Sequence, residues 1–340
     1  MKVLVTGGAG YIGAVLAEML LERGHDVRVL DRLYWGSGPL DRVQNRIEIV
    51  RGDVRSVDEK ILDGVDGVVH LAGLSNDPTA EYNPGANWEM NMVATRNLAE
   101  VCKRAGVNRF TFGSSCSIYD GLPTGPVYDE TAEVQPRGAY ATSKHAAEGA
   151  LLDLTDAKFR PTILRQGTVY GYSPRMRFDL VVNTFVKDAL QKGALSLHGG
   201  GWMWRPLIDV SDVARAHICC LEAPLEKAGG EIFNVFHDNY QIRELAMLVA
   251  GSASMRKFTV ELKDAPLPEI TRDYRCDKSK IRTRLGFEPQ VSVLESIETM
   301  LRWIECEGPV DFSHPRYYNI AWMTLLEEAH RNLEGFPSVF

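Results

Sequence analysis

A glycine-rich segment near the first residue constrains the fold of this chain most strongly. The sequence "KVLVTGGAGYIG" places Gly7, Gly10 and Gly13 directly after an apolar, strand-like run, and apolar residues then recur at helical spacing. Glycines at a strand-to-helix turn let the backbone turn tightly and approach a pyrophosphate, whose charge the exposed N–H groups at the helix start can hold. The segment therefore predicts a dinucleotide-binding unit, although such turns also occur for steric reasons alone.

Apolar strand-like runs alternate with helical patterns through the first half of the chain. After the first run, the others are "VRVL", "IEIV", "GVVHLA", "RFTFG" and "PTILR", with helices predicted over 88–105 and 140–154. This alternation predicts an α/β fold with a doubly wound parallel sheet of the Rossmann type. After about Gly171 the rhythm loosens into loops and short helices. We therefore expect a cofactor-binding domain over 1–170 and a smaller substrate-binding lobe over 171–340, with strand exchange between the two.

The composition excludes several classes of protein. The chain has 340 residues, 45% of them hydrophobic and 24% charged, which is typical of a globular protein. A net charge of −7 gives no general attraction to nucleic acid or to an anionic membrane. The six cysteines show no metal-ligand spacing, and neither a signal peptide nor a long apolar run is apparent. We expect a cytoplasmic protein with no metal, nucleic-acid or membrane partner.

Asp31 closes the second predicted strand, 18 residues after Gly13. A carboxylate at this position can bind the adenosine ribose hydroxyls of a dinucleotide and repel a 2′-phosphate. This context favours a dinucleotide site over a purely steric role for the glycines, and it favours NAD as the cofactor. The adjacent Arg32 keeps NADP open as an alternative.

The segment "YATSK" predicts a catalytic pair on a helix. Tyr140 and Lys144 share one helical face one turn apart, so the lysine ammonium can favour the ionised phenol. A tyrosine normally titrates near ~10 and becomes a useful base near neutral pH only with such help. The same spacing arises by chance in many helices. Ser115, at the end of the fifth strand-like run, could orient a substrate oxygen against Tyr140, which makes these three residues the candidate catalytic set.

In this order along most of the chain, the glycines, Asp31, "HLAG", Ser115 and "YATSK" resemble the extended short-chain dehydrogenase/reductase family of nucleotide-sugar epimerases and dehydratases. The resemblance implies NAD as cofactor, a nucleotide-diphosphate sugar as substrate, and a homodimer in which helices 88–105 and 140–154 form a four-helix bundle. The cofactor-binding residues that it implies are Gly7, Gly10, Tyr11, Ile12, Gly13, Asp31, Arg32, Asp53, Val54, Leu71, Ala72, Gly73, Asn91, Tyr140 and Lys144.

The resemblance also implies a substrate site. Arg205 in "RPLIDVSDVA" and Arg275 in "DYRCDKSKIRTRLGF" resemble family arginines that meet the sugar-nucleotide diphosphate. Thr168 stands where the family commonly has asparagine, and the segment after about Gly308 has no assigned role. The candidate substrate-binding residues are Ser75, Ser115, Cys116, Ser117, Thr168, Arg177, Asn183, Arg205 and Arg275. For Arg177, in the loop "SPRMRFD", a solvated surface position is an equal alternative.

Departures from the family pattern narrow the reaction. In 4,6-dehydratases an Asp-Glu pair follows the catalytic hydroxyl, and family decarboxylases tend to have glutamate where Ser117 stands, whereas here Cys116 and Ser117 follow Ser115. Some family 3,5-epimerases use a cysteine at the position of Ser117, so Cys116 is expected to be structural, with proton transfer as the alternative. One base, one hydroxyl and one nicotinamide support reversible oxidation at a single carbon, which predicts a C4 epimerase working through a 4-keto sugar. The alternative is a 4-ketoreductase or dehydrogenase, since a non-catalytic NAD-binding protein would be expected to lose Tyr140 or Lys144.

Overall fold

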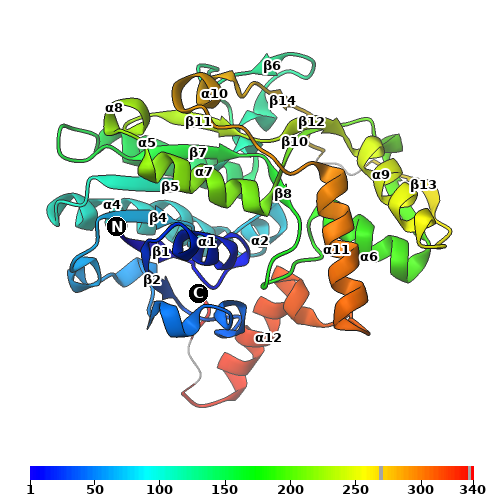
Figure 1. Ribbon diagram of the computed structural model, residues 1–340, viewed down its shortest axis with the longest axis horizontal. Helices are drawn as coiled ribbons and strands as arrows, with labels where there is room; N and C mark the ends of the chain where they lie inside the picture. Colours follow the sequence, from blue (N-terminus) through cyan, green and yellow to red (C-terminus); the bar gives the residue numbers. More distant parts are fainter. Residues whose placement is uncertain (268–270, 336–337) are drawn as a thin grey trace.

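The large sheet is parallel throughout, as the alternating pattern predicts. The computed structural model describes residues 1–267, 271–335 and 338–340, and its seven-stranded sheet has the order β11-β7-β5-β4-β1-β2-β3 (Figure 1). Its strands are β1 (Lys2–Thr6), β2 (Asp26–Asp31), β3 (Glu48–Arg51), β4 (Gly67–His70), β5 (Arg109–Ser115), β7 (Thr162–Gln166) and β11 (Ile232–Val235). All six strand-like runs of the first half are confirmed, and β11 comes from the second half of the chain. The strand order reverses between β1 and β4, where ligands bind at the carboxyl ends of doubly wound sheets.

Helices cover both faces of this sheet because successive strand residues point to opposite sides. Val3 and Val5 on β1 pack with α1 (Tyr11–Glu22) and α7 (Val210–Glu222) (Figure 1). Leu4 packs on the other face with α4 (Ala94–Arg104) and α5 (Gly138–Asp153). α5 (Gly138–Asp153) confirms the predicted helix 140–154.

The predicted helix 88–105 is interrupted in the structure. It consists of α3 (Pro84–Trp88), a π-helical turn at Glu89–Val93, and α4 (Ala94–Arg104). A π-helical turn holds one residue more than an α-helical turn and is frequent at functional sites. Here it carries Asn91, whose side chain is completely buried beside the candidate site.

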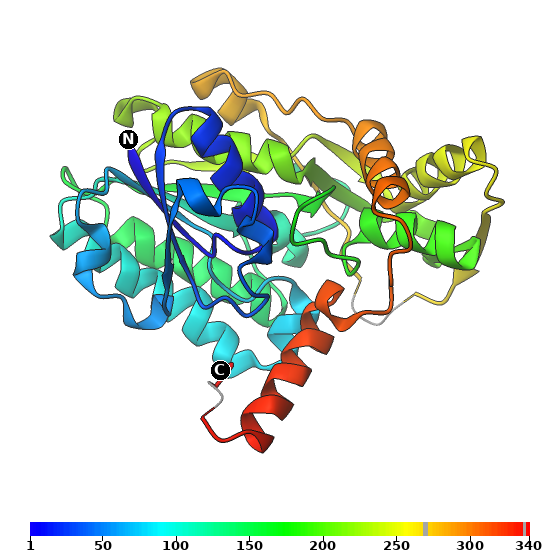
Figure 2. The same ribbon diagram turned by 60° about the horizontal axis from the view of Figure 1, so that its bottom comes forward.

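The second lobe is built around small sheets and three long helices. β12 (Asp238–Gln241), β10 (Trp204–Asp209) and β8 (Thr168–Tyr170) form one sheet, and β9 (Ala194–His198) pairs with β13 (Glu261–Ala265). The helices are α6 (Val181–Lys192), α9 (Ile242–Met255) and α11 (Val293–Glu307). Shorter elements are α2 (Asp77–Tyr82), α8 (Leu225–Ala228), α10 (Ser279–Leu285), β6 (Val127–Tyr128) and β14 (Arg275–Cys276). The last helix, α12 (Asn319–Asn332), leaves this lobe and turns back beneath the first (Figure 2).

Two absences apply to the described part of the chain. Within residues 1–267, 271–335 and 338–340, no helix combines the length and apolar character that crossing a membrane requires. The same residues contain no group of three or more His, Cys, Asp or Glu side chains that could hold a metal ion.

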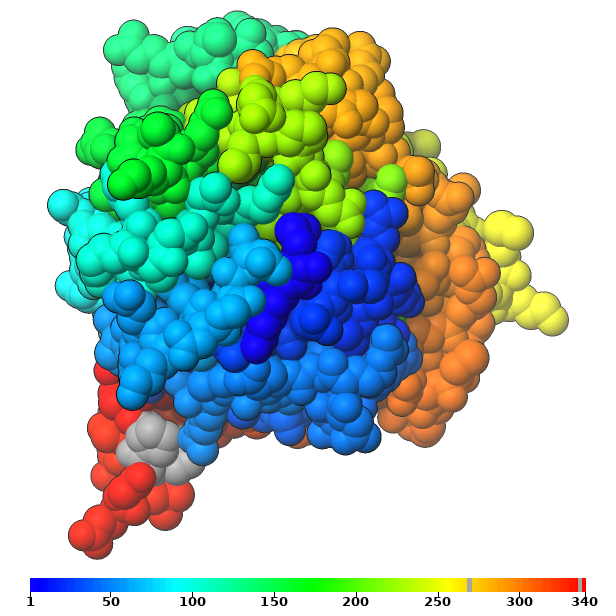
Figure 3. All heavy atoms as spheres, turned by 60° about the vertical axis from the view of Figure 1, so that its left-hand side comes forward, coloured from blue at the N-terminus to red at the C-terminus, as the bar shows by residue number. Residues whose placement is uncertain are grey.

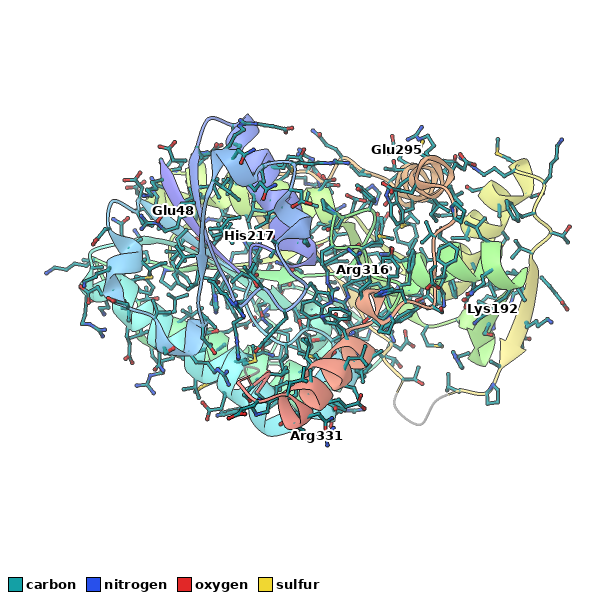
Figure 4. All side chains as sticks on the ribbon, turned by 90° about the horizontal axis from the view of Figure 1, so that it is seen from below. Glu48, Lys192, His217, Glu295, Arg316 and Arg331 are labelled. Carbon is teal, nitrogen blue, oxygen red and sulfur yellow. The ribbon has the colours of Figure 1, made fainter. Side chains whose placement is uncertain are left out.

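Two histidines packed against the large sheet are completely buried. His217 lies in the interior on α7 (Figure 4), where its Nδ1 is 2.9 Å from the Thr111 hydroxyl and its Nε2 is 2.9 Å from the Gln166 amide nitrogen. An amide nitrogen can only donate, so Nε2 of His217 accepts and the ring is neutral. Burial lowers the pKa of His217, and likewise that of His70 on β4, to about 3.

We expect the protein to lose stability in acid because of these two rings. Their pKa lies below the ~6.5 of an unfolded histidine, so stability is complete above that value and falls as the pH drops toward 3. Each ring contributes about 1.4 kcal/mol per pH unit over this window. Denaturant unfolding between pH 5 and pH 7.5 should show a shallower slope for His217→Asn, while the exposed control His198→Gln keeps the wild-type slope. An unchanged slope in His217→Asn would contradict the assignment.

Candidate functional site

A single cleft at the carboxyl ends of β1, β2, β4, β5 and β7 brings most of the predicted site residues together. It lies at the point where the strand order reverses, and residues of the second lobe form its opposite wall. The predicted residues that line it are Gly7, Gly10, Tyr11, Ile12, Gly13, Asp31, Arg32, Asp53, Val54, Leu71, Ala72, Gly73, Ser75, Ser115, Tyr140, Thr168 and Arg177.

The glycines form a cradle that has no room for side chains. Gly7 has φ +72°, and a Cβ on it would lie 2.8 Å from the Ala72 amide nitrogen. A Cβ on Gly13 would lie 2.6 Å from the Gly8 Cα, because α1 packs directly on the turn. No side chain caps the start of α1 at Gly10, and its first turn contains no acidic residue. Free N–H groups at a bare helix start fit a dinucleotide pyrophosphate.

Asp31 is held in a fixed orientation at the end of β2. Its two carboxylate oxygens accept hydrogen bonds from the Ala9 N–H at 3.0 Å and the Leu33 N–H at 2.7 Å. Burial raises its pKa, and these backbone hydrogen bonds act in the opposite direction. Each oxygen keeps a lone pair for a ribose hydroxyl. Arg32 forms an ion pair with Asp53 at 3.1 Å, so its charge is already engaged. This arrangement fits a ribose without a 2′-phosphate.

We therefore expect NAD to bind at least about tenfold more tightly than NADP, because a 2′-phosphate would meet the Asp31 carboxylate. Calorimetric titration with both dinucleotides measures the ratio. Asp31→Asn should reduce the preference for NAD over NADP. Asp26 is an exposed aspartate at the other end of β2, so Asp26→Asn should leave this preference unchanged. Tighter binding of NADP by the wild-type protein would overturn this expectation and identify Arg32 as a phosphate ligand.

Ser115, Tyr140 and Lys144 meet at the centre of the cleft. Ser115 ends β5, where its hydroxyl accepts a hydrogen bond from the Ser117 N–H at 3.1 Å, and its side chain lies close enough to Tyr140 on α5 to act against the rise in the pKa of the phenol. Lys144 lies just behind the cleft wall, where its Nζ donates to the Gly113 carbonyl at 2.9 Å and lies 5.9 Å from the centre of the Tyr140 ring. The phenol is thus the group of this set that can donate or accept a proton at a bound substrate, with the serine hydroxyl beside it.

The electrostatics of Tyr140 differ from the expectation based on the spacing to Lys144. Burial raises the pKa of Tyr140 to about 12, and the Asp77 carboxylate adds to this effect. The cation that acts most strongly in the opposite direction is Arg272, because Lys144 is turned toward the Gly113 carbonyl. Burial also lowers the pKa of Lys144 to about 8. Tyr140 is therefore a neutral phenol at pH 7 that can donate a proton, and it can accept one only after it has lost its own.

Arg272 is a site residue that the sequence reasoning missed. It lines the cleft and forms an ion pair with Asp77, the first residue of α2. Arg275, which the resemblance implies instead, lies outside the cleft wall and contacts the Gly125 carbonyl and the Trp204 ring. In extended backbone, residues three apart point to opposite faces, so Arg272 and Arg275 cannot both face the cleft. Alternation along "TRDYR" was the only signal that could have separated them.

Of the two other arginines predicted to bind substrate, Arg177 lines the cleft and Arg205 does not. Arg177 lines the cleft, where Asp179 holds its guanidinium through bonds of 2.7 and 3.0 Å and Ser75 accepts a further bond at 3.0 Å. Arg205 is not part of the cleft wall, and its guanidinium lies 5.7 Å from the centre of the Tyr274 ring. Burial lowers the pKa of Arg205.

Two predicted asparagines support the cleft from behind. Asn91 donates from its amide to the Leu74 carbonyl at 2.9 Å, and its oxygen has no partner among the described residues. Asn183 donates to the Tyr11 hydroxyl at 3.1 Å, and Tyr11 in turn donates to the Gly171 carbonyl at 2.5 Å. Asn183 therefore orients a residue of the cofactor cradle and does not face the substrate space.

The residues after Ser115 point into the protein. The Cys116 thiol is completely buried and donates to the Arg165 carbonyl at 3.1 Å, which fits a structural role. Ser117 is also buried, and its hydroxyl has no partner among the described residues. Neither side chain lines the cleft.

A buried ion pair lies beneath the catalytic residues. Glu148, one turn after Lys144 on α5, pairs with Arg165 at 2.8 Å and accepts a hydrogen bond from Ser114 at 2.5 Å. Its charge opposes the fall in the pKa of Lys144. The pair joins β7 to α5, and the hydrogen bond from Ser114 joins the end of β5 to α5, which fixes Ser115 relative to Tyr140. Its spacing of four residues from Lys144 was a signal available in the sequence.

The chain is similar in sequence and in structure to known NAD-dependent enzymes that act on nucleotide sugars. Residues 3–235 match the NAD dependent epimerase/dehydratase family. UDP-glucose 4-epimerase of Corynebacterium glutamicum is 28% identical over 321 residues, which cover 87% of this chain and 93% of that protein. UDP-glucuronic acid decarboxylase 2 of Arabidopsis thaliana is 31% identical over 316 residues, which cover 89% of this chain and 68% of that protein. The structure of a dTDP-glucose 4,6-dehydratase of Streptomyces venezuelae with NAD bound superposes with a TM-score of 0.78 at 27% identity, covering 90% of this chain and 97% of that one.

Proposed function

This chain belongs to the NAD-dependent epimerase/dehydratase family, and we propose that it is an epimerase that inverts C4 of a nucleotide-diphosphate sugar. NAD is its cofactor, and the glycine cradle with Asp31 fits that group. The relatives above have names for three different reactions at similar identities. The choice among these reactions therefore depends on the residues of this chain.

The observation that carries the proposal is the environment of Tyr140. Its phenol and Ser115 face the cleft, while Cys116 and Ser117, at the positions where family dehydratases carry their Asp-Glu pair, are buried behind it. The carboxylate that acts most strongly on Tyr140 is Asp77, which is already paired with Arg272. A dehydratase needs a further acid and base beside the sugar. One proton-transferring phenol is sufficient for oxidation and reduction at one carbon.

Bound NAD supplies reversible hydride transfer to and from the sugar carbon. The Tyr140 phenol must first lose its own proton to solvent. The phenolate then takes the proton of the C4 hydroxyl as the 4-keto sugar forms, and the resulting phenol returns that proton when the hydroxyl is restored. Ser115 hydrogen-bonds the same oxygen and keeps it against the phenol. Arg272 and Arg177, both in the cleft wall, can bind the diphosphate when it replaces Asp77 and Asp179, the carboxylates with which they are paired in the structure. The reaction inverts C4 when the ketone presents its opposite face before the hydroxyl is restored.

The substrate can be identified by incubating the purified protein with UDP-, dTDP-, GDP- and CDP-sugars and following the sugar signals by NMR. A new C4 isomer from one of these donors supports the proposal. A 4-keto-6-deoxy sugar or a pentose would instead show dehydration or decarboxylation and would reject it.

We also propose that the enzyme is a homodimer in which α4 and α5 pair with the same helices of a second copy. Trp88 and Leu152, large apolar residues on α3 and α5, are 40% and 39% exposed in the single chain. Burying them across a two-fold axis would remove this apolar surface from water. Sedimentation at micromolar concentration should give a dimer, and Leu152→Asp should shift it toward monomer. Leu294→Asp, at an exposed site on α11, should not. A wild-type monomer would reject this assembly.

A further inference from the structure

The C-terminal strap, defined here as α12 and residues 338–340, packs against the cofactor side of the molecule. Figure 4 marks its course, with Arg316 just before α12 and Arg331 near its end, and Figure 3 shows the C-terminal residues at the lower edge of the first lobe. We propose that this strap completes the cofactor site: it closes the adenosine side of the cleft and keeps the dinucleotide bound between turnovers. This inference goes beyond the proposed epimerisation.

The first turns of α12 form part of the cleft wall. Asn319 and Met323 line the same cleft as the glycine cradle, and both are almost completely buried. The Asn319 amide nitrogen donates to the Ser75 hydroxyl at 3.0 Å, so it joins the strap to the loop that follows β4. Met323 packs with Leu74 and Met90 in a small apolar cluster of the first lobe. The strap is thus a structural part of the site.

The strap also positions a buried cation toward the cleft. Arg175 is 5% exposed, lines the cleft, and donates to the Asn319 side-chain oxygen at 2.5 Å, with its guanidinium 4.0 Å from the centre of the Trp35 ring. Among the described residues no carboxylate lies within ion-pair distance of it. Asp179 and Asp31 act on its charge only from farther away, and burial lowers its pKa to about 9. A buried charge that has no counterion in direct contact is costly. The pyrophosphate of a dinucleotide in this cleft would supply a closer negative charge.

The end of the strap holds the segment that follows Asp31. Val339 is 2% exposed, and its carbonyl accepts hydrogen bonds from Arg32 at 3.0 Å and from the Tyr34 hydroxyl at 2.5 Å. The Trp322 indole donates to the Tyr34 carbonyl at 2.8 Å. Arg32 and Tyr34 both line the cleft, so release of the adenosine side requires these bonds to break. The same contacts hold Arg32 against Asp53.

Retention of NAD tests this role directly, with no sugar nucleotide present. The wild-type protein, a chain ending at Tyr318, and Val339→Asp are saturated with NAD and passed through gel filtration; bound NAD is then released by denaturation and quantified, and its dissociation rate is measured. Both strap variants should lose NAD at least about tenfold faster than the wild-type protein, equivalent to about 1.4 kcal/mol. The control Leu325→Asp, on the exposed side of α12, should retain it.

Folding of each variant is checked by far-UV circular dichroism. A folded strap variant that keeps NAD as long as the wild-type protein would overturn the inference, and so would equally fast release from Leu325→Asp. If the shortened chain does not fold, the dissociation rate of Val339→Asp decides alone. This experiment measures NAD dissociation and not sugar conversion. Its outcome therefore neither supports nor contradicts the proposed epimerisation, which is tested separately.

Discussion

Replacing Tyr140 by phenylalanine is expected to lower kcat by about 10³-fold or more while NAD remains bound. The phenol is the group that exchanges a proton with the sugar hydroxyl, and such groups contribute ~10²–10⁴-fold to rate. The glycine cradle that holds the cofactor is separate from it, so calorimetric NAD affinity should change little. Initial rates on the substrate found by NMR, together with NAD titration, measure both quantities.

The matched control is Tyr240→Phe, which removes a phenol hydroxyl from β12 in the second lobe, outside the cleft wall. It should leave kcat within a factor of two or so of wild type, as most substitutions outside special sites do. Wild-type turnover in Tyr140→Phe would show that another group transfers the proton. Loss of NAD binding in that variant would show a structural role for the phenol instead.

Gly13→Ala is expected to abolish tight NAD binding, with a loss of affinity of about 100-fold or more. The added Cβ would lie 2.6 Å from the Gly8 Cα and closer still to the Gly7 carbonyl oxygen, and both are backbone atoms that cannot rotate away. The turn and α1 must separate to make room, at a cost of about 1–3 kcal/mol, and the N–H groups of the cradle move with them. NAD titration and denaturant unfolding measure the two effects.

Gly251→Ala provides the matched control for this prediction. Gly251 lies in α9, away from the cleft and the proposed dimer helices, and a Cβ added there would meet nothing within 4 Å. Alanine in a helix interior is favoured over glycine by about 0.5–1 kcal/mol, so this variant should be slightly more stable and bind NAD normally. Wild-type affinity in Gly13→Ala would mean that the cradle does not hold the cofactor.

The sequence predicted those features that depend on local pattern. The strands of the first lobe are short apolar runs because a parallel sheet is covered on both faces, and Tyr140 and Lys144 lie within one helix whose period fixes their common face. Asp31 was identifiable because its distance from the glycines is set by one strand–helix–strand unit.

Other features depend on contacts between segments far apart in the sequence. The raised pKa of Tyr140 arises from its burial and from Asp77, while Arg272 acts in the opposite direction, and the fold brings both residues to the phenol from other elements. The π-helical turn around Asn91 has no periodic signal that separates it from a continuous helix. The role proposed for α12 rests on its contacts with Arg175 and Tyr34, which the sequence does not reveal because the apolar pattern of α12 is that of any packed helix.

Conversion of a nucleotide sugar carrying deuterium at C4 tests the proposed epimerisation most directly. The purified enzyme is incubated with this substrate and a catalytic amount of NAD, while NMR follows the sugar and absorbance follows NADH. An epimerase returns the same hydride that it removes, so we expect a C4-inverted product that keeps its deuterium, with no net change in NADH. Stoichiometric formation or consumption of NADH, or loss of the deuterium to solvent, would contradict C4 epimerisation.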